Sequence, residues 1–468
     1  MKTVFILSDS YRRDHLGLYN RAVHTPNLDR LAATACVFDQ AYVGSFPTGP
    51  NRRDVMLGRG PAPGCAFNPW KNLEASETPF AHRLSEAGVC TQMITDVANQ
   101  VTRGANLMKG FQYYLVNRGQ EGDGYSCNQD VDVTCRLPKE LVRYGAHGYG
   151  NVLLNRARRR IEDDWFAPRT FRWACEWLEQ NWKRDDFFLW VETFDPHEPW
   201  DPPPYYVDRY DPGYRGRVVE FPPYGYHRRL GITDREVRHL QARYAGECTM
   251  VDHAVGRLLA TLEKLGLLDE TAVFFTSDHG INAGLPGDAG LVGRPWVVEK
   301  DLGAWLVGGS FALKNPQWLP MRTGTMRLPL LIKMPGQRRA RRIARIAQPW
   351  DLAPTILDLF GQKAPPERQG ESLLPVMRGG RRPPRPYAFN GHYMGKTHLA
   401  QAMNAEWIYA VWPGGEEPPW LIDLRRDPKQ LRNAAARHPD VCRRMHDAVA
   451  RFDPEPFRNV SNPWTTRR

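Results

Sequence analysis

The stretch Val273-Phe-Phe-Thr-Ser-Asp278-His279-Gly280 decides the fold. An apolar run rich in Val and Phe is typical of a strand buried on both faces of a parallel sheet, and this run ends at an Asp-His-Gly corner. Open α/β sheets bind ligands just beyond the carboxyl ends of their strands. A carboxylate and an imidazole there would suit a divalent cation such as Mn²⁺, Zn²⁺ or Ca²⁺. The alternative is a strand that ends in an Asx turn beside an incidental histidine.

Length and charge limit the classes of function. At 468 residues the chain is longer than one core usually supports, so we expect a large domain and a smaller one. The formal net charge is +11, with arginines clustered at 156–160 and 338–345. No zinc-finger, RNP or helix-turn-helix signature accompanies these clusters, which favours solvated faces over a nucleic-acid partner. The positive excess remains compatible with a small anionic substrate.

Cysteine usage and the first residues bear on location. The eight cysteines are scattered without a C-x-x-C pair, a pattern that favours reduced thiols over disulfides or a zinc site. The chain enters an apolar run at once, without the pattern of a signal peptide, and no apolar run reaches membrane-spanning length. We therefore expect a cytoplasmic protein without a membrane partner. The sequence leaves a homo-oligomer open.

A second strand end carries another carboxylate. Val4-Phe-Ile-Leu7 is an apolar run, and Asp9 follows it directly. Asp9 therefore has the same local position as Asp278, and two carboxylates at neighbouring strand ends would hold one cation between them. The alternative is an aspartate that caps the next segment.

A hydroxyl and an arginine are spaced by one helical turn. An apolar helical segment follows the motif Thr48-Gly-Pro-Asn-Arg52. We therefore expect Thr48 at the N-terminus of a helix, where anions are stabilised. Arg52 would face the same spot and neutralise charge on a nucleophilic oxygen. The alternative is that Thr48 only caps the helix.

A histidine follows a third apolar run, Phe187-Phe-Leu-Trp-Val191. It lies in Asp195-Pro-His197-Glu-Pro-Trp200, where proline on both sides stiffens the loop. The tunable pKa of an imidazole suits a general acid. The alternative for His197 is a surface residue in a proline-rich turn.

Together these motifs resemble the sulfatase branch of the alkaline phosphatase superfamily. They occur in order along the chain: the Asp9 strand end, His24-Thr-Pro-Asn-Leu-Asp-Arg-Leu31, Thr48-x-Pro-x-Arg52 with Gly58-Arg59, Asp195-Pro-His197-Glu-Pro-Trp200, and Ser277-Asp278-His279-Gly280. The resemblance implies an α/β fold with a doubly wound, mostly parallel sheet. It also implies one divalent metal ion (Mn, Ca or Zn) held by Asp9, Asp278 and His279. His197 would contact the ester oxygens or protonate the leaving group.

The sequence departs from this family at its most reactive position. Sulfatases carry Cys or Ser at the head of the C/S-x-P-x-R motif, and that residue is oxidised to formylglycine. Here Thr48 stands at the head, and threonine is not a substrate for this maturation. Threonine nucleophiles occur in phosphodiesterase-like and phosphomutase-like members of the superfamily. Phosphorus chemistry is therefore favoured.

Other positions of the anion site also differ from the family pattern. Asp96, Ala98 and Asn99 stand where many sulfatases carry Lys and His, and Ala289 stands where relatives show His. Arg294 replaces a typical Lys and, with its planar fork, would bind a substrate anion. Asn99 is a weaker candidate for a substrate contact.

The chain divides into a catalytic α/β domain at 1–370 and a C-terminal α+β subdomain at 371–468 with a small antiparallel sheet. The stretch 118–165 gives little pattern. The favoured function is metal-dependent hydrolysis of phosphate or phosphonate mono- or diesters by Thr48. One alternative is a sulfatase that uses Thr48 directly, and another is a catalytically silent relative that binds anions.

Overall fold

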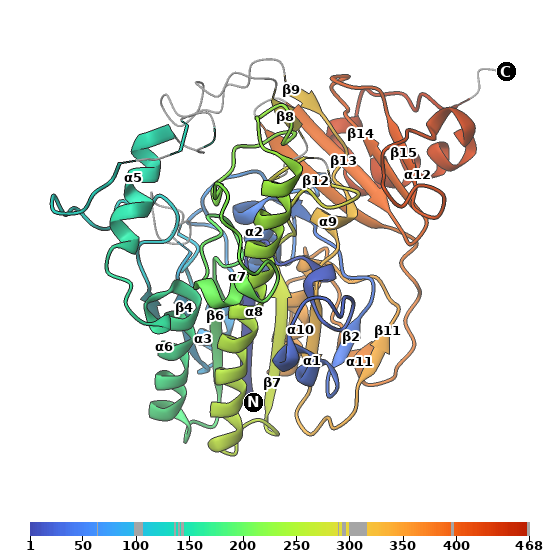
Figure 1. Cartoon of the computed structure of the whole chain (residues 1–468). Helices are drawn as coiled ribbons and strands as arrows, with labels where there is room; N and C mark the ends of the chain where they lie inside the picture. The colour runs from blue at the N-terminus through green and yellow to red at the C-terminus, as the bar shows by residue number, and fades with distance from the viewer. Residues whose placement is uncertain are drawn as a thin grey trace.

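The computed structural model describes residues 1–62, 64–97, 106–134, 137–138, 141, 145–288, 290–292, 296–298, 316–394 and 397–465. Within these residues the chain forms a large central sheet flanked by helices and a smaller sheet near the C-terminus (Figure 1). This confirms the predicted α/β class and the mostly parallel sheet. The predicted boundary between 1–370 and 371–468 stays a prediction.

The large sheet has eight strands. Their spatial order is β11 (Arg341–Ile343), β2 (Cys36–Phe38), β10 (Leu330–Lys333), β7 (Thr271–Ser277), β1 (Lys2–Ser8), β6 (Phe187–Thr193), β4 (Cys90–Thr95) and β5 (Tyr113–Val116). The run from β7 to β5 is parallel, and β10 is antiparallel to both of its neighbours. The three apolar runs read as strands from the sequence, β1, β6 and β7, are therefore adjacent in the centre of the sheet.

The central strands are apolar on both faces because helices cover both. In β1, Phe5 and Leu7 belong to one hydrophobic core, whereas Val4 and Ile6 belong to another on the opposite face. The helices and further strands are α1 (Pro26–Ala32), α2 (Thr48–Leu57), α3 (Phe80–Glu86), α5 (Gly145–Arg156), α6 (Phe166–Asn181), α7 (Pro204–Asp208), α8 (Asp234–Lys264), α9 (Thr323–Met326), α10 (Leu352–Leu359), α11 (Leu374–Met377), β8 (Trp296–Val298) and β9 (Pro316–Trp318). In Figure 1, α6 and α8 lie side by side in front of the sheet.

Helix α8 begins after a capping box. Thr233 Oγ1 accepts a hydrogen bond from the backbone N–H of Glu236, and the Glu236 side chain accepts one from the backbone N–H of Thr233. Such reciprocal capping satisfies two N–H groups that have no partner within the helix. His253, which we interpret as a satisfied helix residue, lies 2.8 Å from the Tyr206 hydroxyl through Nδ1.

The small sheet joins distant parts of the chain. Its order is β15 (Trp420–Asp423), β14 (Trp407–Val411), β13 (Thr397–Met403), β12 (Ala388–Met394) and β3 (Ser45–Phe46). The first four strands are antiparallel, as predicted, and α12 (Pro439–Phe452) packs against them. The fifth, β3, comes from the N-terminal part and pairs with β12 in parallel. The C-terminal sheet is therefore attached to the segment immediately before Thr48.

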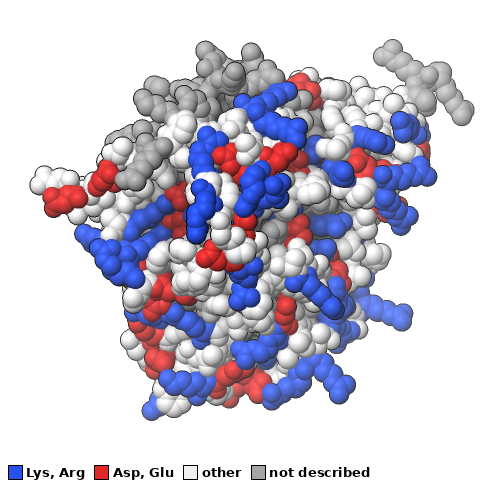
Figure 2. Space-filling model, viewed as in Figure 1, with Lys and Arg blue, Asp and Glu red and all other residues white. Residues whose placement is uncertain are grey.

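Two general properties complete the description. None of the helices within the described ranges is both long enough and apolar enough to cross a membrane. Basic and acidic side chains are interspersed over the face shown in Figure 2. In the cluster at 156–160, however, Arg156 and Arg159 are largely buried and pair with Asp201, so the expectation of a solvated face is wrong for these two residues.

Candidate metal and nucleophile site

The carboxyl ends of β1 and β7 bring Asp9 and Asp278 together. The two strands pair in parallel with Ser8 opposite Ser277, so the residues that follow them are neighbours. The backbone N–H of Ser10 donates to Asp278 Oδ1 at 3.0 Å, which ties one strand end to the other. The proximity expected from the sequence is confirmed.

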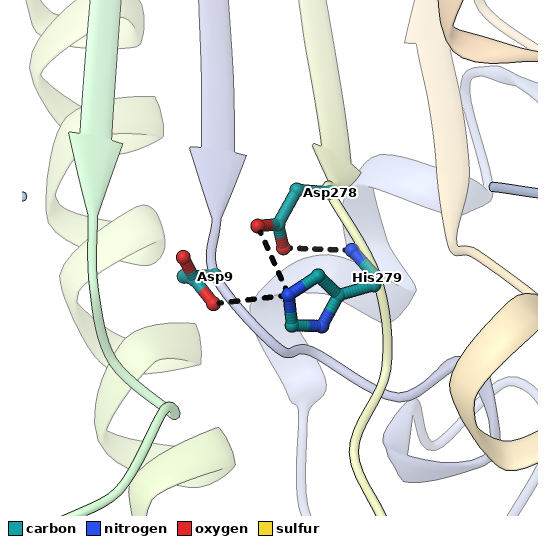
Figure 3. A group of neighbouring side chains, drawn as sticks. All are labelled: Asp9, Asp278 and His279. Atoms are coloured by element: carbon teal, nitrogen blue, oxygen red, sulfur yellow. Dashed lines mark hydrogen bonds and ion pairs between the residues drawn. The ribbon is translucent and has the colours of Figure 1, made fainter. Parts of the chain in front are cut away.

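His279 completes a group of three possible metal ligands (Figure 3). Its Nδ1 lies 2.8 Å from the carbonyl oxygen of Gly280, which can only accept, so Nδ1 carries the proton and Nε2 presents a lone pair. Nε2 is 3.5 Å from Asp278 Oδ2 and 4.0 Å from Asp9 Oδ1. The ligand atoms of all three buried residues lie within 4.8 Å of one another.

The electrostatics of this group suit a divalent cation. Burial, together with the negative charge of Asp278, raises the pKa of Asp9 well above its usual range. Burial also pushes the pKa of Asp278 upward, but His279 and Arg52 outweigh this and lower it to about 2. Two buried carboxylates and an imidazole lone pair that face one point repel one another. A cation bound between them would relieve that repulsion, so the residues present fit a metal.

Arg52 lies on the other side of the two aspartates and is fully buried. Its Nη1 donates to Asp278 Oδ2 and to the Thr48 carbonyl oxygen at 2.5 and 3.0 Å, and its Nη2 donates to Asp9 Oδ2 at 3.0 Å. Nε and Nη2 both face Glu192 Oε1 at 2.6 Å. All three nitrogens of the guanidinium thus donate to protein oxygens. Arg52 therefore holds the aspartates and the Thr48 backbone. Its predicted role in neutralising charge on a nucleophilic oxygen stays a prediction.

Thr48 is the first residue of α2, and its side chain points toward the metal ligands. Pro47 occupies the N-cap position, so the interpretation of Thr48 as the capping residue is wrong. Its Oγ1 lies 3.3 Å from His279 Nε2, and its side chain is almost fully buried. The hydroxyl therefore lies beside the Asp9, Asp278 and His279 group, at a helix N-terminus that favours negative charge.

His197 lies in the loop after β6, the strand on the other side of β1. Ser8 Oγ donates to the carbonyl oxygen of Asp195 at 2.7 Å, which anchors this loop beside the Asp9 strand end. The His197 ring stacks on Phe194 with centroids 4.0 Å apart, and Nδ1 donates to the Glu198 carbonyl oxygen at 2.7 Å. The structure thus places His197 at the same edge of the sheet. Its role toward a leaving group stays a prediction.

Two predicted substrate contacts, Asn99 and Arg294, lie outside the described residues, as does Ala289. The nearby Asp96 is buried, and its carboxylate accepts hydrogen bonds from Thr170 Oγ1 at 2.7 Å and from the backbone N–H of Phe194 at 2.5 Å. These contacts are structural and do not suit the binding of an anion. Asp96 therefore supports the loop that carries His197.

Sequence reasoning missed Glu192 and Ser10. Glu192 ends an apolar strand, and a carboxylate at that place was a readable signal because a buried charge needs a partner. Ser10 Oγ donates to Asp9 Oδ1 at 2.8 Å, and its backbone has a φ of 61°, a local geometry that no sequence pattern announced.

Comparisons with known proteins agree with this geometry. A family model described as "Sulfatase" matches residues 2–362, and one described as "N-sulphoglucosamine sulphohydrolase, C-terminal" matches 320–453. Arylsulfatase K of Danio rerio is 29% identical over 45% of this chain and 36% of its own length. An arylsulfatase of Clostridium perfringens is 24% identical over 92% of this chain and 89% of its own length.

Solved structures show the same fold. The phosphonate monoester hydrolase of Agrobacterium radiobacter superposes with a TM-score of 0.70 at 19% identity, covering 97% of this chain and 96% of that one. At such identity the likeness concerns the fold alone. The family model, however, spans most of the chain, and the chain therefore belongs to the sulfatase family of hydrolases.

Proposed function

We propose that this chain hydrolyses small anionic phosphorus esters, with Thr48 Oγ1 as the nucleophile and one divalent cation held by Asp9, Asp278 and His279. The observation that carries the proposal is the 3.3 Å separation between Thr48 Oγ1 and His279 Nε2, inside a buried group of metal-ligand type. A hydroxyl with only a structural role would cap the helix instead.

In the proposed reaction each residue of the site has a distinct role. When bound, the cation supplies Lewis acidity that polarises the ester and lowers the pKa of a nearby hydroxyl. Thr48 Oγ1 releases its proton to solvent and attacks phosphorus, so that a new O–P bond forms while the bond from phosphorus to the alcohol oxygen breaks. His197 delivers a proton to that oxygen and later regains one from solvent. Water then attacks phosphorus, the O–P bond to Thr48 breaks, and a proton of the water restores the Thr48 hydroxyl. Arg52 keeps the two aspartates and the Thr48 backbone in register throughout.

The choice of phosphorus over sulfur rests on the chemistry of threonine. Oxidation at its Cβ would give a ketone, not the aldehyde that a formylglycine site requires. A threonyl ester must therefore be opened by water attacking the central atom. Phosphonate and sulfate esters are the substrate classes named among the similar proteins.

A sulfatase that uses Thr48 directly is the second candidate, favoured by the arylsulfatases among the relatives. A third candidate is an anion-binding relative without turnover. The buried ligand group and the inward hydroxyl of Thr48 favour an enzyme over this third candidate.

The test compares initial rates on an aryl phosphodiester, an aryl phosphonate monoester and an aryl sulfate, using Mn²⁺-loaded protein. Thr48→Ala should abolish turnover, whereas Thr48→Ser keeps the hydroxyl and should retain it. Sulfate as the best substrate would contradict the phosphorus assignment. Full activity of Thr48→Ala would contradict the nucleophile.

A further inference from the structure

Helix α2 carries a buried carboxylate, Asp54, behind the nucleophile segment. Its side chain is fully buried. The backbone N–H of Ser45 donates to Oδ2 at 2.6 Å, and the Ser45 hydroxyl donates to Oδ1 at 2.8 Å. Ser45 begins the short strand β3 that leads directly into Pro47 and Thr48. Asp54 therefore binds the chain just before the nucleophile to the helix just after it.

Asn68 closes this contact into a ring of hydrogen bonds. Its Nδ2 donates to Asp54 Oδ1 at 2.7 Å, and its backbone N–H donates to Ser45 Oγ at 2.7 Å. The Ser45 hydroxyl thus donates to one group and accepts from another, which fixes its orientation. Such fully connected buried networks restrict the backbone to one arrangement.

The C-terminal sheet holds the other side of the same segment. His392 lies opposite Phe46 in the β12–β3 pair, and its Nδ1 donates to the Phe46 carbonyl oxygen at 2.9 Å. The Phe46 ring in turn lies 4.8 Å from the His279 ring, centroid to centroid. The segment between Ser45 and Thr48 is therefore clamped between Asp54 and β12, next to a metal-ligand candidate.

This arrangement is costly for a residue that only fills space. All three hydrogen-bond donors to Asp54 are neutral. The positive charge of Arg53 offsets only part of the effect of burial, and within the described parts of the chain no ion pair forms with Asp54. Burial raises the pKa of Asp54 to about 7. A buried carboxylate that has no ion-pair partner destabilises a fold, so its presence behind Thr48 favours a role other than packing.

We propose that Asp54 is a positioning residue for Thr48: it holds Ser45 so that the Thr48 hydroxyl stays directed at His279 Nε2. The inference rests on the proposed function, because it assigns Asp54 to the same reaction. Without the Asp54 contacts, the backbone that leads into α2 would adopt more conformations. The Thr48 hydroxyl would then no longer be held in the direction from which it attacks phosphorus. Misplacement of a nucleophile by about 1 Å typically costs 10²-fold in rate.

The test uses Asp54→Asn and Ser45→Ala, with Asp252→Asn as the matched control. Asp252 is also buried, also accepts from three neutral donors, at Asn27 and Leu28, and has its pKa raised to about 6, but it supports α1. We expect kcat of Asp54→Asn to fall about 10- to 100-fold with KM within about 2-fold, and Ser45→Ala to fall about 3- to 10-fold.

Asp252→Asn should lose thermal stability to a similar degree but keep kcat within about 2-fold. An Asp54→Asn enzyme with wild-type kcat, or an Asp252→Asn enzyme equally slow, would overturn the inference. If the wild type turns over no ester, the proposed function fails. In that case, crystal structures of wild type and Asp54→Asn test the positioning role. The positioning role predicts that the distance from Thr48 Oγ1 to His279 Nε2 grows beyond hydrogen-bond range in the variant. An unchanged distance would contradict it.

Discussion

Two adjacent arginines of α2, Arg52 and Arg53, are both fully buried, yet their surroundings differ. Arg53 donates to Asn68 Oδ1 at 3.1 Å and to the Asn72 carbonyl oxygen at 2.8 Å, and it pairs with one carboxylate, Glu77. Its charge is balanced one to one. Arg52 faces three carboxylates, so its surroundings carry excess negative charge.

The different charge balance around the two arginines indicates different roles, structural for Arg53 and functional for Arg52. When one buried arginine pairs with one buried carboxylate, their charges cancel. When one buried arginine faces three carboxylates, negative charge is left over, and a further cation would neutralise it. The imbalance therefore marks the side of α2 that faces the metal ligands. The same helix serves as a structural support on one side and as part of the site on the other.

The largest effect should come from Arg52→Lys. Lysine offers three donors on a flexible stem and cannot hold Asp9, Asp278, Glu192 and the Thr48 carbonyl oxygen together. We expect kcat/KM to fall about 10³-fold, equivalent to about 4 kcal/mol, in steady-state assays of Mn²⁺-loaded protein. If kcat/KM of Arg52→Lys stayed within 10-fold of the wild-type value, the proposed difference between the two arginines would be contradicted.

Glu77→Gln should show the opposite profile. It leaves the Arg53 charge buried and uncompensated, so we expect a loss of about 3 kcal/mol in the free energy of unfolding, measured by urea titration. Because Glu77 lies on the balanced side, kcat should stay within about 3-fold of wild type. A large loss of kcat in molecules that are still folded would show that the Arg53 side also serves the reaction.

Cation binding should stabilise the wild type and not a variant that lacks the charge imbalance. At 100-fold excess of Mn²⁺ over its Kd, the free energy of unfolding should rise by about 2.7 kcal/mol. Asp9→Asn removes one carboxylate of the repelling pair. Its metal-free form should therefore be at least as stable as metal-free wild type, with little gain from Mn²⁺. Calorimetry with and without chelator gives both values, and equal Mn²⁺ stabilisation of both proteins would contradict the ligand assignment.

Measured per pH unit, the smallest effect concerns Asp54, whose carboxylate accepts hydrogen bonds from Ser45 and Asn68. Its pKa is about 7 in the folded protein, against 3.8 for a free aspartate. Between these values the folded state keeps a proton that the unfolded state releases, so stability falls as pH rises from about 4 to 7. Relative to Asp54→Asn, the wild type should lose up to about 1.4 kcal/mol per pH unit in this window. Parallel pH curves for the two proteins would show that Asp54 is not protonated on folding.

Much of this organisation could be predicted from sequence because it is local. A buried apolar strand followed by a polar residue repeats at Asp9 and Asp278, and parallel pairing makes neighbours of such strand ends. The turn that carries Thr48 and Arg52 has a short motif of its own. Those features depend on a few consecutive residues.

The rest depends on contacts between distant segments. The pairing of β3 with β12 joins Ser45 to Gly391, and nothing near either residue indicates the other. The contact of Arg52 with Glu192 also joins α2 to β6, because Glu192 supplies the acceptor for the Arg52 Nε. The role of Asp54 likewise became visible only when Asn68 and Ser45 were placed around it.

The most direct test of the central claim is to trap the covalent intermediate. Mn²⁺-loaded protein is mixed with excess aryl phosphonate monoester and denatured in acid during turnover, and its peptides are analysed by mass spectrometry. The account predicts a phosphonyl adduct on the hydroxyl of Thr48 that disappears when substrate is exhausted and never forms in Thr48→Ala. Turnover with the adduct on another residue would contradict it, as would turnover that persists in Thr48→Ala.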